Sequence, residues 1–96
     1  MLFALICTDK PNSLELRLSS RPAHVAFLNG LGNGLKLAGP FTDDAGSPTG
    51  SLVVIEATDR SAAQALAAQD PYAIAGLFSS VEIKPWKWAI KNPEAA

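Results

Sequence analysis

The 96-residue chain contains one cysteine, one histidine and few charged residues, which make up 18% of the sequence. A single cysteine cannot form an internal disulfide, so we expect the protein to work in a reducing compartment, the cytoplasm. Cys7 ends an apolar run and is expected to be buried and inert. One histidine and one cysteine cannot supply the ligands of a three- or four-coordinate zinc site, so no metal centre is predicted.

The sequence also lacks a basic run, a long apolar run and a phosphate-binding loop. Its net charge of −1 and its pI near 5.7 argue against a nucleic-acid partner. The apolar opening MLFALIC is too short for a signal peptide or a membrane span and is typical of a first strand. The stretch GLGNG follows a predicted helix instead of a strand, unlike a nucleotide-binding turn. We therefore expect neither a membrane partner nor a cofactor.

Apolar residues make up 48% of the chain, which suffices for one domain over residues 1–96, with a loose tail from about residue 91. The apolar patterns predict strands over residues 2–8, 35–41, 52–58 and 81–88. They predict helical segments over residues 13–32, 62–68 and 71–78, and a polar loop over residues 42–51. Because Pro22 removes a backbone hydrogen bond, we expect the first segment to form two helical pieces, the second starting near Ser20.

This order of elements is β-α-β-β-α-β, which predicts an α+β, ferredoxin-like fold. Two helices would cover one face of a four-stranded antiparallel sheet and leave its other, apolar face bare. A second copy packed sheet against sheet would cover that face, so we expect a homodimer. Three aromatic side chains are expected to pack the sheet or this interface and not to bind a ring compound: Phe41, Trp86 and Trp88.

The lone histidine, His24, shares a face of the predicted helix with Leu28 and Leu31. It could be a core residue bonded to a backbone carbonyl, or a general acid or base, because imidazole exchanges a proton near neutral pH. Asp70 precedes a proline and could cap the turn that follows. It could also hold one ring nitrogen of His24 and fix the tautomer, and the two roles of Asp70 can coexist.

Further polar residues lie near these two in sequence. Arg17 and Arg21 flank Ser19, and the three could bind an anion, since arginine matches a carboxylate in shape and charge. Helix capping and a solvated surface are the alternative. Tyr72 follows Asp70 by two positions and could either line the same pocket or pack in the core.

The segments RLSSRPAHVAFL, LAGPF and DPYAIAGLFSSVEIKPW resemble the YciI-like, or YCII-related, family over residues 1 to about 90. That resemblance implies a dimeric α/β barrel, with His24 and Asp70 as a catalytic pair in a pocket beside the dimer interface. Related dimeric α/β-barrel families include muconolactone isomerases and small monooxygenases, which act on ring compounds. The chain departs from the family at NGLGNG and in a short loop over residues 43–51, and both departures bear on the shape of the pocket.

The hypothesis that follows is a cofactor-free enzyme that acts on a small organic acid or ring compound. Its chemistry would be elimination, isomerisation or a lactone-type rearrangement, with His24 as general acid or base and Asp70 as its orienting group. Arg17 or Arg21 would anchor a substrate carboxylate. The alternative is a non-catalytic dimeric module that binds a small ligand or is purely structural, in which His24 and Asp70 only lock two helices together.

Overall fold

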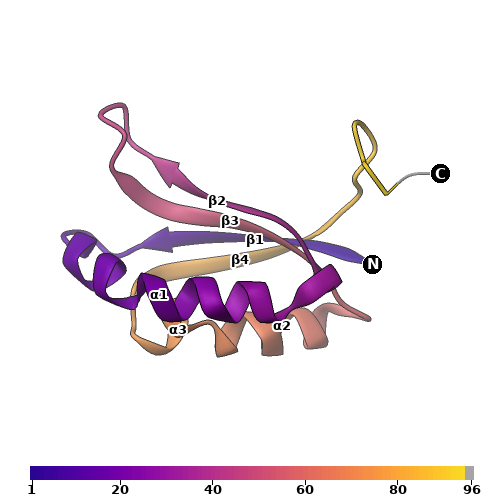
Figure 1. The fold of residues 1–96 in the computed structure, drawn as a ribbon, viewed down its shortest axis with the longest axis horizontal. Coiled ribbons are helices and arrows are strands. Elements are labelled where there is room, and N and C mark those ends of the chain that lie inside the picture. The colour runs from indigo at the N-terminus through magenta and orange to yellow at the C-terminus, as the bar shows by residue number, and fades with distance from the viewer. Residues whose placement is uncertain (95–96) are drawn as a thin grey trace.

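The computed structural model, which describes residues 1–94, has one antiparallel sheet with its helices on one face (Figure 1). The strands lie in the order β2-β3-β1-β4. They are β1 (Leu2–Asp9), β2 (Leu35–Thr42), β3 (Pro48–Glu56) and β4 (Phe78–Trp86). The helices are α1 (Leu14–Gly30), the 3₁₀ turn η1 (Gly32–Gly34), α2 (Arg60–Gln69) and α3 (Pro71–Ile74). The predicted ferredoxin-like arrangement is confirmed.

The core lies between the sheet and the helices, because side chains alternate between the two faces of each strand. On β1, Phe3, Leu5 and Cys7 point to the helices and are at most 5% exposed. They pack with Leu28 of α1 and with Val53 and its neighbours on β3. Burying a large apolar side chain stabilises a fold by about 1.5–3 kcal/mol, so this layer holds α1 against the sheet.

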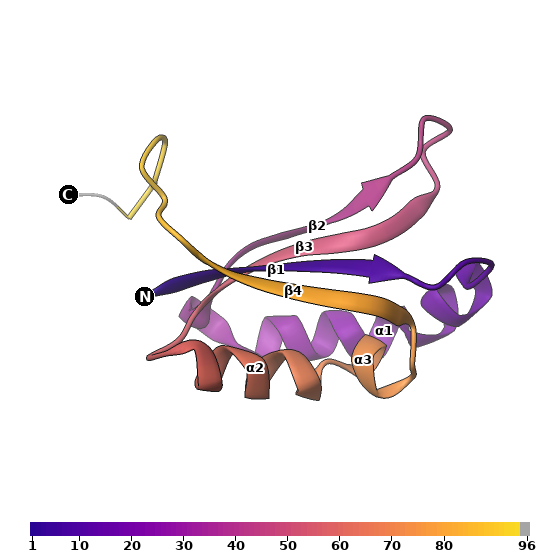
Figure 2. The ribbon, with the colours of Figure 1, turned by 180° about the vertical axis from the view of Figure 1, so that it is seen from behind.

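The opposite sheet face carries no helix, as seen from both sides (Figure 2). The alternate residues of β1 point there, and Ile6 lies opposite Leu52 of β3. Both are half-buried, while Phe41 and Trp86 are 42% and 38% exposed. The bare face is therefore apolar, as the sequence predicts. No helix within residues 1–94 is long and apolar enough to cross a bilayer.

The first helix differs from the prediction, because α1 is one helix of 17 residues that contains Pro22. Proline removes the hydrogen bond to the carbonyl four residues earlier, which here belongs to Leu18. Pro22 lies on the exposed side of the helix, where water can hydrogen-bond to that carbonyl. The expected break into two pieces is therefore wrong.

The strand β3 also differs from the prediction, since it begins at Pro48 inside the expected polar loop and ends at Glu56. Its first residues pair with the end of β2, where Phe41 lies opposite Gly50. Only residues 43–47 remain as a turn, in which Asp43 Oδ1 accepts hydrogen bonds from the backbone of Ala45 and Ser47. Backbone pairing extended these strands where the side-chain pattern gave no sign of it.

The last third of the chain turns sharply twice before it enters the sheet. Asp59 caps α2, and its Oδ1 accepts a hydrogen bond of 2.8 Å from Ala62. Gly76, with φ of +78°, ends the α3 segment earlier than predicted, so β4 begins at Phe78. Beyond β4, Lys36 forms an ion pair with Glu94. The expected loose tail extends to residues 95–96, which lie outside the described residues.

Candidate active site

The side chains of His24 and Asp70 meet in the structure. His24 comes from α1, and Asp70 stands between α2 and α3. His24 Nδ1 lies 2.8 Å from Asp70 Oδ1 and 3.0 Å from Oδ2, and the two residues are only 8% and 6% exposed. A carboxylate can only accept a hydrogen bond, so Nδ1 carries the proton and the lone pair of a neutral ring is on Nε2.

Asp70 has a second role at the start of α3. Its Oδ1 also accepts a hydrogen bond of 2.9 Å from the backbone N–H of Tyr72, as an N-cap does. Pro71 occupies the first position of that helix, where its fixed φ is favoured. The capping and the histidine contact thus coexist, and the cap fixes the carboxylate that holds His24.

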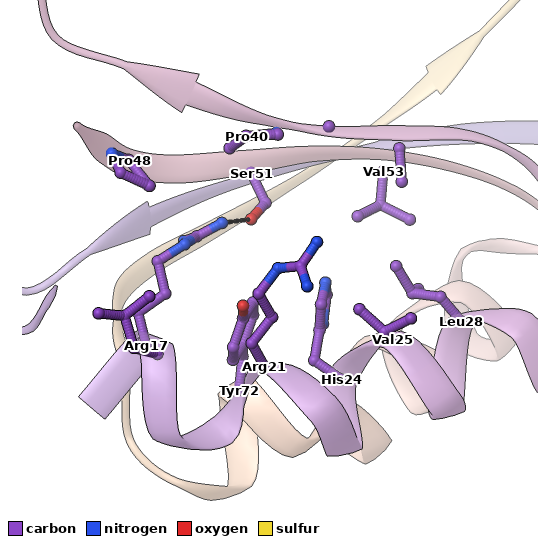
Figure 3. Close-up of a pocket in the computed structure, with 13 residues that line it drawn as sticks. Arg17, Arg21, His24, Val25, Leu28, Pro40, Pro48, Ser51, Val53 and Tyr72 are labelled. Atoms are coloured by element: carbon purple, nitrogen blue, oxygen red, sulfur yellow. Dashed lines mark hydrogen bonds between the residues drawn. The ribbon is translucent and has the colours of Figure 1, made fainter. Parts of the chain in front are cut away.

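A cavity of about 260 Å³ opens beside this pair, between α1 and the edge formed by β2 and β3 (Figure 3). Val25, Leu28 and Val53 give it an apolar wall. Its polar lining comes from Arg17, Arg21, His24, Ser51 and Tyr72. In Figure 3 the His24 ring rises from α1 toward β3 with a nitrogen at its tip, on the same side as the Arg21 guanidinium. The cavity thus combines an apolar wall with hydrogen-bond donors and an imidazole.

Tyr72 supports the imidazole from its face. The two rings are stacked, with 3.8 Å between centroids and 14° between planes, and Tyr72 is 1% exposed. The guanidinium carbon of Arg17 lies 4.9 Å from the centre of the same tyrosine ring. Burial raises the pKa of the Tyr72 phenol, while the positive charges of Arg17 and Arg21 act to lower it.

Arg17 is held by two residues that the sequence did not single out. Its Nη1 donates a hydrogen bond of 2.8 Å to Asp9 Oδ2, and its Nη2 donates one of 2.8 Å to Ser51 Oγ. The side chains of Arg17 and Asp9 are both 7% exposed. Asp9 ends β1, and Ser51 lies on the core-facing side of β3. A serine at a core-facing position of an otherwise apolar strand is the sequence feature that could have marked Ser51 as a site residue.

The remaining predicted site residues lie apart from this buried network. Arg21 is exposed, lines the cavity, and forms no ion pair or side-chain hydrogen bond within residues 1–94. Ser19 is exposed, its hydroxyl donates to the carbonyl of Leu16 at 3.0 Å, and it does not line the cavity. The structure therefore brings Arg17, Arg21 and Tyr72 to His24 and Asp70, but not Ser19.

Nowhere in residues 1–94 do three or more His, Cys, Asp or Glu side chains gather closely enough to hold a metal ion. The thiol of Cys7 is buried in the core, and burial together with the nearby charges of Asp70 and Asp9 raises its pKa from 9.0 to about 12.

Fold and site together define a class: a small ferredoxin-like protein with a buried histidine–aspartate pair at the wall of a ring-sized cavity. A model of the YCII-related domain matches residues 1–87. The chain belongs to the YCII-related family. It is 44% identical over 95 residues to the protein YciI of Escherichia coli, covering 91% of this chain and 97% of that protein. A protein of Haemophilus influenzae is 40% identical over 95 residues, which cover 91% of this chain and 97% of that protein.

Solved structures with the same fold include two proteins whose names describe an enzyme activity. The 5-chloro-2-hydroxyhydroquinone dehydrochlorinase of Burkholderia phenoliruptrix, solved with 2,5-dihydroxybenzoquinone, is 32% identical with a TM-score of 0.83. The match covers 91% of this chain and 94% of that chain. SnoaB, a cofactor-independent oxygenase from Streptomyces nogalater, matches with a TM-score of 0.56 and 13% identity, over 94% of this chain and 95% of that one. At that identity the likeness shows the fold alone.

Proposed function

We propose that this protein is a cofactor-free enzyme that moves protons on a small anionic ring compound, with His24 as its general acid or base. One observation carries the proposal: Asp70 holds Nδ1 of a buried imidazole whose Nε2 is left for the cavity. A histidine that served only the core would be enclosed by other side chains, whereas His24 lines the cavity. Asp70 is the orienting group that fixes the tautomer and stabilises the imidazolium.

In the elimination that this arrangement suits, Nε2 takes a proton from a C–H or O–H bond of the ring compound. The electron pair of that bond moves into the ring and forms a new π bond. Chloride can depart only from a tetrahedral carbon, so in an aromatic substrate His24 first passes the proton of one ring hydroxyl to the carbon that bears the chlorine. Nε2 then takes the proton of a second hydroxyl, the freed electrons form a π bond to that carbon, and chloride departs with the electron pair of its own bond. His24 returns to the neutral form when it gives the proton to water, or to another ring atom if the reaction is an isomerisation.

The size and lining of the cavity support a substrate of one ring. An apolar cavity of roughly 150 Å³ accepts benzene, so about 260 Å³ leaves room for a substituted ring. The apolar wall suits a ring face, and the exposed guanidinium of Arg21 suits its anionic oxygens. The dehydrochlorinase that is 32% identical takes its name from a hydroxylated, chlorinated ring compound, and we propose the same class of substrate here.

We also propose that the protein is a homodimer in the cytoplasm. The bare sheet face exposes Phe41 and Trp86 beside half-buried leucine and isoleucine side chains. A contiguous apolar surface of this kind is typical of an interface, and a two-fold dimer would bury it. The single, buried cysteine suits a reducing compartment.

The test measures chloride release from 5-chloro-2-hydroxyhydroquinone by the wild-type protein and by His24→Asn, Asp70→Asn and the double variant. Loss of a general base should lower turnover by roughly 10²–10⁴-fold in His24→Asn. Asp70→Asn should lose a similar factor, because an amide can favour the wrong tautomer. The losses should not add in the double variant, since the two residues act as one unit.

Melting temperatures of the same variants separate this proposal from the non-catalytic module. Variants that stay folded and still bind 2,5-dihydroxybenzoquinone, but no longer release chloride, support the enzyme. Full turnover in a folded His24→Asn protein would overturn the mechanism. Binding without turnover by the wild type, over a panel of hydroxylated and chlorinated rings, would favour the binding module instead.

A further inference from the structure

The hydroxyl of Tyr72 has no partner within residues 1–94, although 99% of the residue is buried. Three contacts hold the Tyr72 ring in place: it stacks on His24, packs edge to face against Phe78, and lies under the Arg17 guanidinium. Buried tyrosines normally find a hydrogen-bond partner for this group. A donor at the end of a buried, immobilised ring that has no partner in the protein can donate to a ligand in place of water.

That hydroxyl is open to the cavity. Among residues 1–94, the one side-chain oxygen or nitrogen that is both fully buried and unpartnered is Oδ1 of Asp9. The Tyr72 hydroxyl, which is also unpartnered, must therefore be in contact with solvent. Tyr72 lines the cavity, and Figure 3 shows its oxygen pointing toward β3, on the same side as the tips of Arg21 and His24.

The stack places this oxygen beside the reacting nitrogen. The rings of Tyr72 and His24 are stacked nearly parallel, with 3.8 Å between their centroids. The phenol oxygen of Tyr72 and Nε2 of His24 therefore lie at the edges of two adjacent rings, on the side of the cavity. One ring compound could therefore present its reacting bond to Nε2 and an adjacent oxygen to the phenol. Arg21, exposed and without an ion pair among the described residues, can approach the same oxygen.

We propose that Tyr72 is a catalytic residue whose hydroxyl donates a hydrogen bond to the substrate oxygen on which negative charge grows as His24 removes a proton. The inference rests on the proposed function and names the group that would stabilise the resulting oxyanion, together with Arg21. Such a preorganised donor costs no reorganisation during the reaction, since the ring is already fixed by its neighbours.

The state of the phenol suits this role. Burial raises its pKa, so the hydroxyl keeps its proton at neutral pH and acts as a donor, while the nearby positive charge of Arg21 favours an anionic acceptor. A phenolate at this position would repel the oxyanion instead.

The variant Tyr72→Phe tests the proposal, because it removes only the hydroxyl and keeps the ring that supports His24. The probe is 2,5-dihydroxybenzoquinone, and calorimetry measures its affinity for the wild-type protein and the variant. Loss of a hydrogen bond to a charged oxygen should weaken binding by roughly 10- to 100-fold. Ser61→Ala is the matched control, since it removes an exposed hydroxyl in α2 that lies outside the cavity lining, and it should bind as the wild type does.

A second measurement does not depend on any variant. The chain has one tyrosine, so the wild-type protein with isotope-labelled tyrosine gives one NMR signal for the ring carbon that bears the hydroxyl. That signal should shift on addition of the probe if the hydroxyl donates to it. An unshifted signal, or equal affinity in Tyr72→Phe and wild type, would overturn the role of Tyr72 and leave the proposed function standing. A wild-type protein that does not bind the probe would overturn both.

Discussion

Arg17 and Arg21 occupy one helix, four positions apart, yet their surroundings differ completely. Arg17 is 6% exposed and donates to Asp9 and Ser51 at 2.8 Å each. Arg21 is exposed and forms no ion pair among the described residues. At neutral pH the charge of Arg17 is therefore offset by Asp9, and the charge of Arg21 remains to attract an anion.

We expect Arg17→Ala mainly to lower the stability of the fold and Arg21→Ala mainly to weaken the binding of an anionic ligand. Arg17→Ala leaves the Asp9 carboxylate buried without a partner, which should lower the free energy of unfolding by about 3–5 kcal/mol. Arg21→Ala changes an exposed side chain, so unfolding should shift by less than about 0.5 kcal/mol, while binding of an anionic ring weakens. Urea unfolding and calorimetry measure the two effects. Equal stability of the two variants would contradict the structural role of Arg17.

The thiol of Cys7 gives a prediction about pH. Burial raises its pKa to about 12 in the folded protein, above the ordinary value of 9.0 that it regains on unfolding. The folded state therefore keeps its proton at pH values where the unfolded state loses it. This contribution to stability is complete below about pH 9 and declines as the pH rises toward 12.

At pH 8 a disulfide reagent should not react with Cys7 in the folded protein and should react fully in denaturant. Absorbance of the released thiol follows the reaction in both conditions. Rapid modification of the folded protein, at the rate of a small free thiol, would show that the core around Cys7 opens readily.

At the scale of the elements, the side-chain pattern predicted the number and order of the strands and the order of the helical segments, but not the unbroken α1 or every boundary. Gly50 explains why the start of β3 was predicted too late, since a glycine in a polar stretch normally indicates a loop. Here Gly50 lies in β3, paired with β1 and β2, and a Cβ atom at this position would stand 2.2 Å from the backbone oxygen of Cys7. The close approach of two strands requires this glycine, and a single sequence does not reveal which backbone will approach.

Pro22 explains the other miss and carries a prediction. Proline inside a helix costs about 3 kcal/mol relative to alanine, and α1 tolerates it because the packing of Leu28 and its neighbours holds the helix in place. We expect Pro22→Ala to raise the free energy of unfolding by roughly 1–3 kcal/mol, reduced by the greater freedom of the unfolded chain. Denaturant unfolding monitored by circular dichroism measures the change.

Pro71→Ala serves as the control, because Pro71 stands at the first position of α3, where proline is favoured. That variant should not gain stability. A Pro22→Ala protein no more stable than wild type would mean that α1 already compensates fully for the missing hydrogen bond.

At the scale of the whole molecule, the site joins residues from β1, α1, β2, β3 and α3 and from the turn before α3. The sequence could single out His24 and Asp70 as candidates for chemistry, since a lone histidine and an aspartate before proline are distinctive residues. It could not predict the Asp9–Arg17–Ser51 network, because the contact spans 34 positions between Arg17 and Ser51 and depends on the strand order β2-β3-β1-β4. Local patterns fix which face a residue takes, and only the assembled sheet decides which residues meet there.

The bare sheet face leads to the last prediction, which concerns assembly. If a second copy covers this face, Leu52→Arg should give a monomer, because the charge would be buried at the centre of the interface and opposite Ile6 of β1. In a monomer the same arginine would reach water from a half-buried position, so the fold should survive. Light scattering with size-exclusion chromatography measures the mass. Ile74→Arg is the matched control: Ile74 is 73% exposed on α3, on the helical side, and this variant should keep the mass of a dimer. A wild-type protein that is monomeric at micromolar concentration, or a dimeric Leu52→Arg, would place the interface elsewhere or remove it.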